Sequence, residues 1–351
     1  MTSVHGPTLI KRQLQLYFLK PFVSNTKTMT ITTSLAGSKK AFALSVLEGL
    51  RSVPKQISSK YFYDEHGDRL FQQIMRMPSY YLTDSEYEIF DHQKGSILRH
   101  LGNHPFDLIE LGAGDGLKTK VLLRHLLENG ISFKYRPVDI SSSVLDTLQG
   151  SLEEELPDLE VAPLHGEYFQ VLEDLQQLGD HQKKVIFFLG ANIGNLTREE
   201  SLAFLSQLNE LLAPGDMLLL GVDLKKDPAV ILEAYNDSEG ITAAFNLNLL
   251  HRINRELDGN FDVDQFKHWE TYNPLTGETK SYIVSKVQQE VEIGAISSLI
   301  HFDAWEAIEV ELSQKYSVEE VEQLAKSSGF RLVKNFFDSK RYFIDSLWIK
   351  S

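Results

Sequence analysis

The chain has 351 residues, and its 42% hydrophobic and 24% charged content is ordinary for a globular protein with a sizeable core. Acidic residues outnumber basic ones, 49 to 35, the reverse of the balance expected for a nucleic-acid-binding protein. The absence of cysteine excludes disulfides, thiolate zinc sites and cysteine nucleophiles, and no apolar run reaches the roughly 18 residues that a membrane helix needs. We therefore expect a cytoplasmic monomer that acts on a small molecule and binds neither nucleic acid nor membrane.

The first segment of the chain differs in composition from the rest. Residues 1–28 include basic residues such as Lys11 and Arg12 but no acidic residue, and their apolar patch at 16–19 is too short for a signal-peptide core. We expect residues 1–35 to be an extension that is disordered, or the start of the chain to be mis-assigned, with the true start at Met29. The first expected helix spans 38–50.

Beyond residue 106, short apolar runs alternate with helical patterns, a rhythm typical of a parallel α/β sheet. The runs predict strands at 107–111, 133–140, 159–164, 184–189 and 217–224, and the intervening patterns predict helices at 118–127, 143–155 and 198–212. The rhythm stops in the polar stretch 225–313, which is expected to hold helices at 228–235 and 241–256 and strands at 266–272 and 280–288. It resumes with a helix at 318–328 and strands at 331–337 and 342–349, and the short turn between these strands makes them antiparallel neighbours.

A glycine-rich loop follows the first of these strands, in the sequence Glu110-Leu111-Gly112-Ala113-Gly114-Asp115-Gly116. Glycine lets the backbone turn tightly and approach a ligand closely. The dinucleotide-binding fingerprint would need its third glycine at Leu117, and the phosphate-loop pattern fails as well. The spacing E-x-G-x-G-x-G is instead the form used by methyltransferases, whose ligand S-adenosylmethionine (SAM) has no pyrophosphate. We expect the cofactor to be bound by Gly112, Gly114, Gly116 and the nearby Lys118.

The ends of the next two strands support the same cofactor. The second strand ends at Asp139, whose carboxylate can accept hydrogen bonds from both ribose hydroxyls at the sheet edge where such ligands bind. The third strand is followed by Glu167 and Tyr168, a polar and an aromatic side chain suited to holding adenine. No metal is expected, because the histidines show no H-E-x-x-H or similar spacing.

Several long strings of the sequence resemble one family, the histidine Nα-methyltransferases of ergothioneine biosynthesis. The strings lie at 60–64, 77–83, 188–197, 234–237, 240–246 and 311–316. The resemblance covers about residues 38–349 and implies an enzyme that uses SAM to convert histidine to its trimethylated betaine, hercynine.

The α/β rhythm and this resemblance together predict two structural parts. Residues 86–224 plus 314–351 are expected to form the SAM-binding domain, a Rossmann-like α/β sheet whose last strand is antiparallel. Residues 36–85 plus 225–313 are expected to form a second, α+β lobe that binds the substrate.

The resemblance also implies where the reacting end of the substrate is held. Asn195 and Tyr235 would hold its amino and carboxylate groups. The carbonyl of Gly190 would orient the amine, with Tyr63 close by, so that Asn195, Gly190 and Tyr63 serve the transfer step.

The imidazole end would be surrounded by Tyr80, Glu311 and Ser313. Glu311 and Ser313 are two residues apart, so on an extended segment they face one side and can pair with the two ring nitrogens. The family generally has a methionine near the ring where Ser281 stands here, which makes this pocket more polar and roomier.

Two alternatives stay open. One is an N-methyltransferase of another amino acid or amine, although an indole or a phenol would leave Glu311 buried without a partner. The other is a catalytically silent SAM-binding protein, against which the intact Gly112, Asp139 and Asn195 argue.

Overall fold

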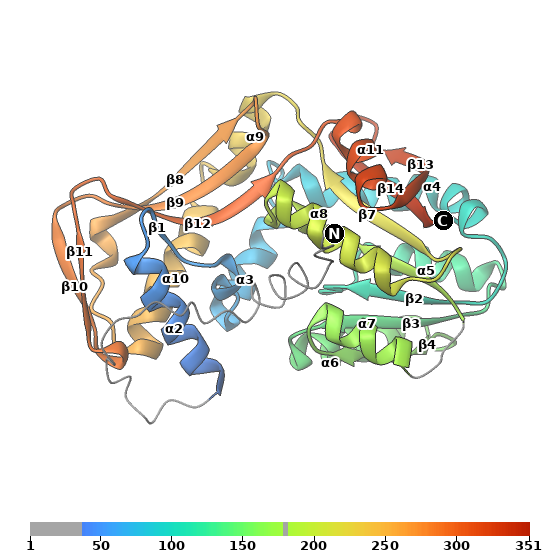
Figure 1. Ribbon diagram of the computed structural model, residues 1–351, viewed down its shortest axis with the longest axis horizontal. Helices are drawn as coiled ribbons and strands as arrows, with labels where there is room; N and C mark the ends of the chain where they lie inside the picture. Colours follow the sequence, from blue (N-terminus) through green and yellow to red (C-terminus); the bar gives the residue numbers. More distant parts are fainter. Residues whose placement is uncertain (1–36, 178–181) are drawn as a thin grey trace, which may run out of the picture.

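The computed structural model describes residues 37–177 and 182–351, so the expectation for residues 1–35 lies outside the described residues. The chain forms an eight-stranded sheet, a four-stranded sheet and a two-stranded ribbon. Figure 1 shows the eight-stranded sheet on one side of the molecule and the other two on the opposite side. None of the helices in the described ranges is long and apolar enough to cross a membrane.

The larger sheet has the order β13-β14-β7-β6-β2-β3-β4, with β5 also paired to β3. Its strands are β2 (Phe106–Leu111), β3 (Phe133–Asp139), β4 (Glu160–Val161), β5 (Leu164–His165), β6 (Lys183–Phe188), β7 (Met217–Asp223), β13 (Phe330–Phe337) and β14 (Phe343–Lys350). Neighbouring strands are parallel except where β14 pairs with β7 and with β13. The predicted Rossmann-like sheet with one antiparallel strand is therefore confirmed.

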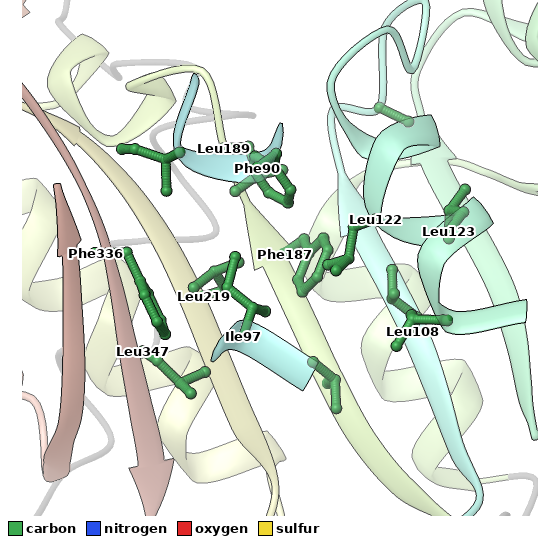
Figure 2. Packing of buried hydrophobic residues seen from close by; sticks show 14 of the residues in the cluster. Phe90, Ile97, Leu108, Leu122, Leu123, Phe187, Leu189, Leu219, Phe336 and Leu347 are labelled. Carbon is green, nitrogen blue, oxygen red and sulfur yellow. The ribbon is translucent and has the colours of Figure 1, made fainter. Parts of the chain in front are cut away.

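Helices cover this sheet because its central strands are apolar on both faces, and β2 and β7 are buried along their whole length. The helices are α4 (Tyr81–Leu101), α5 (Thr119–Glu128), α6 (Ser142–Glu155), α7 (Tyr168–Gln177), α8 (Arg198–Leu211) and α11 (Val318–Ser327). Figure 2 shows how Phe90 and Ile97 of α4 pack with Phe187 of β6 and Leu219 of β7 in the core. Capping boxes at Thr197 and Ser317 begin α8 and α11.

The smaller sheet has the order β1-β12-β9-β8 and lies beside the ribbon β10-β11. The strands are β1 (Lys55–Gln56), β8 (Phe266–Asn273), β9 (Glu278–Ser285), β10 (Gln289–Ile293), β11 (Ser298–Phe302) and β12 (Ala307–Gln314), and the helices are α2 (Gly37–Arg51), α3 (Glu65–Ile74), α9 (Pro228–Tyr235) and α10 (Ile241–Leu257). One hydrophobic cluster joins Phe42 and Phe62 to Phe245, Ile283 and Ile308. Two segments that are far apart in the sequence thus share one core.

Four short 3-10 turns complete the described chain: η1 (Ser59–Phe62), η2 (Asn192–Asn195), η3 (Val263–Gln265) and η4 (Gly294–Ile296). Several expected elements differ from the structure. The strand expected at 159–164 is the two short pieces β4 and β5, and the strand expected at 280–288 ends at Ser285. Strands β10, β11 and β12 and helix α7 were not expected as separate elements, since they are short and lie within polar stretches.

The expected domain boundaries at residues 85 and 313 both fall inside regular elements, α4 and β12. Helix α4 begins at Tyr81, and Tyr81 and Leu82 are buried in the same cluster as the core of the parallel sheet. Because α4 packs against the parallel sheet from its first turn, the helix continues across the domain boundary at residue 85 that the change in sequence pattern suggested.

Candidate active site

The carboxyl edge of the parallel sheet is most open between β2 and β6, where the strand order reverses direction. Gly112, after β2, has φ 73°, and Gly190, after β6, has φ 71°. The side-chain nitrogen of Asn192 lies between these loops. It is 3.4 Å from the position that a Cβ on Gly112 would occupy and 3.8 Å from the position that a Cβ on Gly190 would occupy. Two loops that are almost 80 residues apart thus meet at this switch point.

The glycine loop after β2 fits a ligand that approaches its backbone. Gly114 and Gly116 have φ values of 55° and 65°, which favour glycine. A Cβ on Gly112 would lie 2.7 Å from the hydroxyl oxygen of Tyr168, so that this ring lies over the loop. Glu167 directly precedes Tyr168, the first residue of α7, and is exposed.

Asp139 lies at the end of β3, beside this loop. Its Oδ1 accepts a hydrogen bond from the Ser141 N–H at 2.9 Å. Burial raises the pKa of Asp139, although the backbone N–H groups of Ser141, Gly114 and Ile140 oppose this effect. A half-buried carboxylate next to backbone that a ligand can approach fits the ribose and amino-acid parts of SAM.

The acid of the glycine motif has a different place. Glu110 is buried and accepts hydrogen bonds from the hydroxyls of Thr119, at 2.7 Å, and Tyr135. Burial raises its pKa to about 7. Glu110 therefore supports the loop from behind, by joining β2 to α5 and β3.

Lys118, expected at the cofactor, forms an ion pair with the fully buried Glu86 of α4. Although burial disfavours the ammonium, Glu86 raises the pKa of Lys118 above its usual value. Glu86 also accepts the Gly190 N–H, at 2.8 Å and 3.1 Å to its two oxygens. One carboxylate thus fixes both Lys118 and the peptide of Gly190.

On the other side of the site, four aromatic rings contact one another edge to face. The centroid distances are 5.6 Å from Tyr63 to Phe71, 6.5 Å from Phe71 to Tyr80 and 6.2 Å from Tyr80 to Tyr235. Tyr63 remains 45% exposed, whereas Tyr235 is buried. The structure therefore brings three of the tyrosines expected at the substrate, Tyr63, Tyr80 and Tyr235, together in one row of rings.

The fully buried ammonium of Lys315 lies at the end of this row of rings. It donates to the Tyr235 hydroxyl at 2.6 Å, to Ser313 Oγ at 2.8 Å and to Asp223 Oδ2 at 2.7 Å. The hydroxyls of Tyr235 and Ser313 are themselves 2.9 Å apart. Because Lys315 uses its three protons on these groups, one of the two hydroxyls keeps a proton to give to a ligand.

Asp223, at the end of β7, balances part of this charge. It is buried and accepts from the hydroxyl of Tyr81 at 2.8 Å and from Lys226. Burial alone would raise the pKa of Asp223, but Lys226 and Lys315 hold it below its usual range. Burial lowers the pKa of Lys226 to about 8, so at pH 7 the two ammonium groups and one carboxylate carry a net charge of +1.

Glu311 faces the site because β12 contains a bulge. The pairing register with β9 shifts between Glu309 and Glu311, which places Glu311 opposite Ser281. The Ser281 hydroxyl donates to Glu311 Oε2 at 3.1 Å. Burial raises the pKa of Glu311, and Ser281 and Lys315 oppose this shift.

The turn η2 joins the two halves of the site. A Cβ on Gly194 would lie 2.9 Å from the carbonyl oxygen of Gln314 and 3.7 Å from Ser313 Oγ, so the turn packs directly on β12. Asn195, the next residue, is exposed. Asn195 thus directly follows the glycine that packs against Ser313, which is compatible with a ligand that spans the sheet edge and β12.

Comparison with known proteins identifies the family of this chain. The sequence model of a family described as "Histidine-specific methyltransferase, SAM-dependent" matches residues 42–350. The chain belongs to this family. Histidine N-alpha-methyltransferases of Mycolicibacterium smegmatis and Mycobacterium tuberculosis are each 35% identical to it, over 87% and 85% of this chain and 94% and 91% of those proteins. A solved SAM-dependent methyltransferase from Clostridium acetobutylicum is 12% identical, with a TM-score of 0.40, over 76% of this chain and 91% of that chain.

As a member of the histidine-specific methyltransferase family, the protein is a SAM-dependent enzyme. Within residues 37–177 and 182–351, no three His, Asp or Glu side chains come together as a group that could hold a metal ion.

Sequence reasoning missed four buried charged residues of the site: Glu86, Asp223, Glu270 and Lys315. Asp223 had a signal, since it is an acid at a strand end like Asp139, and Lys315 lies within the string 311–316. Nothing in the local pattern marked Glu86 or Glu270, whose surroundings come from distant segments.

Proposed function

We propose that the protein transfers methyl groups from SAM to the α-amino group of L-histidine, toward the trimethylated product hercynine. The observation that carries this proposal is the charge arrangement of the acceptor site. A positive cluster around Lys315 favours an anion at one end, and the carboxyl of Glu311 favours an N–H donor at the other. An amino acid with a nitrogen-containing side chain matches both ends.

The proposed partner of the Lys315 cluster is the α-carboxylate of the substrate. Tyr235 would donate to it directly, because its hydroxyl oxygen accepts a hydrogen bond from Lys315 and its own O–H remains able to donate. The net positive charge behind Tyr235 would hold the anion without a direct ion pair. We propose that the buried hydroxyl of Ser313, 2.9 Å from that of Tyr235, lies at the same end.

The proposed role of the η2 turn is to hold the α-amine. Asn195 would accept from or donate to the amine, and the carbonyl of Gly190, the residue whose N–H Glu86 binds, would orient it. SAM, when bound, supplies an electrophilic methyl group for in-line displacement. The protein's contribution is then proximity and alignment of the amine, together with the rings of Tyr63 and Tyr80, which can stabilise the cation that grows on nitrogen.

The cofactor half of the proposal uses the loop residues Gly112, Gly114 and Gly116 with Asp139. Tyr168 and Glu167 are proposed to border the adenine, and Lys118 to act through Glu86 and Gly190 rather than by direct contact. We also infer that the partner is a small molecule and that the enzyme works as a cytoplasmic monomer, in keeping with the formal charge of -14.

One alternative substrate class deserves a direct comparison, because Ser281 makes the pocket polar beside Glu311. This feature favours a side chain with two polar nitrogens over an indole or a phenol, which offers fewer hydrogen-bonding groups and would leave a buried polar group unpaired. Another amino acid or amine with such a side chain is the second candidate.

Calorimetry with histidine, tryptophan and tyrosine in the presence of S-adenosylhomocysteine tests the proposal. Histidine alone should bind tightly. Glu311→Ala should weaken histidine binding by about 1.5–3 kcal/mol, the scale of a hydrogen bond to a charged group, and should relax selectivity toward tryptophan. Equal binding of histidine by Glu311→Ala and the wild type would contradict the assigned ring pocket.

A further inference from the structure

A second carboxylic acid lies beside the acceptor site. Glu270 of β8 pairs with Ser281 of β9, and Ser281 pairs on its other side with Glu311 of β12. Residues directly opposite one another in antiparallel strands face the same side of the sheet. Two strand spacings separate the Cα atoms of Glu270 and Glu311 by about 9–10 Å, and only the short side chain of Ser281 stands between them.

Glu270 is only 7% exposed. Within the described part of the chain, neither of its carboxylate oxygens has a hydrogen-bond partner. Ser281 has a single hydroxyl proton, and in this structure it is given to Glu311 at 3.1 Å. Burying an acid without a hydrogen-bonding partner costs free energy. A ligand that supplies such a partner to Glu270 would remove this cost.

Burial and mutual repulsion favour one proton on the pair Glu270 and Glu311. Burial raises the pKa of Glu270 well above its usual range and the negative charge of Glu311 adds to this, although the nearby Ser281 hydroxyl and Lys315 oppose the shift; burial likewise raises the pKa of Glu311. Two carboxyls that share a buried site do not both ionise readily. The other titratable side chains that act on the pair are Lys315, Tyr63, Tyr80, Tyr235 and Tyr282.

We propose that Glu270 is a second recognition residue of the acceptor site, which together with Glu311 brackets a ring that has a nitrogen on each side. This inference rests on the proposed function and specifies how its substrate is selected. A neutral imidazole has one N–H donor and one nitrogen acceptor. The ionised carboxylate of the pair accepts from the N–H, and the protonated carboxyl donates to the other nitrogen.

This arrangement assigns the second ring nitrogen to Glu270 instead of Ser313. The hydroxyl of Ser313 already bonds to Lys315 and Tyr235, at 2.8 Å and 2.9 Å, on the carboxylate-binding side. An indole offers one N–H and no acceptor, so it would leave one carboxyl of the pair unpaired. The pair therefore explains rejection of tryptophan more strongly than one carboxylate does.

Steady-state kinetics on the full chain with saturating SAM test this inference. Glu270→Ala should raise the KM for histidine about tenfold, the effect of leaving one buried hydrogen-bonding group without its partner, and change kcat less than about twofold. Glu270→Gln, whose amide N–H can still donate to the ring nitrogen, should raise the KM less than Glu270→Ala does. The matched control is Glu309→Gln. Glu309 lies on the same strand but faces the opposite side, where it pairs with Lys280 at 3.2 Å, and its loss should leave the KM unchanged.

Ring-methylated histidines distinguish a recognition role of Glu270 from a purely structural one, because only direct contact with the ring makes the enzyme select between the two isomers. The wild type should reject both isomers, because each carries a methyl group where a carboxyl of the pair must bind. Glu270→Ala should accept the one isomer whose methyl group points toward residue 270, with a KM close to the one it has for histidine.

Three results would overturn the inference. They are an unchanged histidine KM in Glu270→Ala, acceptance of either ring-methylated isomer by the wild type, and equal rejection of both isomers by Glu270→Ala. The wild-type result needs no variant to fold. Failure of the wild type to methylate histidine would remove the proposed function and this inference with it, whereas methylation with any of the three results would remove the inference alone.

Discussion

The buried ammonium of Lys315 donates to the hydroxyl of Tyr235 at 2.6 Å and so connects the acceptor site to the end of the parallel sheet at Asp223. Lys315→Met should remove the positive charge behind Tyr235 and raise the KM for histidine more than tenfold, because loss of a partner from a buried charge pair costs about 2–5 kcal/mol. SAM binding should stay close to that of the wild type.

The control for this variant is Lys225→Met, which removes an ammonium that pairs with Glu320 at 3.0 Å outside the cluster. Kinetics for both variants, with calorimetry of SAM binding, separate the two effects. A Lys315→Met enzyme that keeps the wild-type KM would contradict the role given to the cluster.

Asp139→Ala should weaken SAM binding by roughly 2 kcal/mol, because the carboxylate can no longer accept from the ribose hydroxyls. Asp146→Ala, at an exposed position of α6, is the matched control and should bind SAM like the wild type. Calorimetry measures both. Unchanged affinity in the Asp139 variant would rule out the assigned ribose contact.

Gly112→Ala should weaken SAM binding beyond the effect of backbone strain. The added Cβ would lie 2.7 Å from the Tyr168 hydroxyl, at a residue with φ 73°. Gly130→Ala has a similar φ of 67° but nothing within 4 Å of its Cβ, so it should lose stability without losing SAM affinity. If the two variants bind SAM equally well, close approach at Gly112 is not required.

Glu110 predicts a pH dependence of stability. Folding raises its pKa from 4.5 to about 7, so the folded state holds this proton more tightly than the unfolded state does. Its contribution to the free energy of unfolding is largest below pH 4.5 and falls by about 3 kcal/mol as the pH rises through 7. Urea unfolding of Glu110→Gln should show a flatter pH dependence over this window, although the variant is less stable overall. An identical slope in both proteins would contradict the assignment.

The parallel sheet could be predicted because short, mostly apolar strands alternate with helical patterns and end in glycine or an acid, as at Gly112 and Asp139. The acceptor site was harder to predict. Alternation from the buried Ile308 and Val310 would turn Glu311 outward, and only the bulge after Glu309 restores its inward direction. Family resemblance supplied Glu311, since a local period could not.

The contacts of Glu270 and Glu86 could not be predicted from local sequence at all. Glu270 becomes part of a carboxyl pair through its pairing with β9, and Glu86 meets Gly190, which is 104 residues away. Such contacts depend on how whole helices and strands pack together, so the residues adjacent in sequence to Glu270 or Glu86 do not indicate them.

The most direct test of the account is product analysis of the wild-type protein incubated with histidine and SAM. Mass spectrometry and NMR should find methyl groups on the α-nitrogen, rising to three, with both ring nitrogens unmodified, and tryptophan and tyrosine should give no product under the same conditions. Absence of α-N-methylated histidine, or methylation of a ring nitrogen, would contradict the central claim.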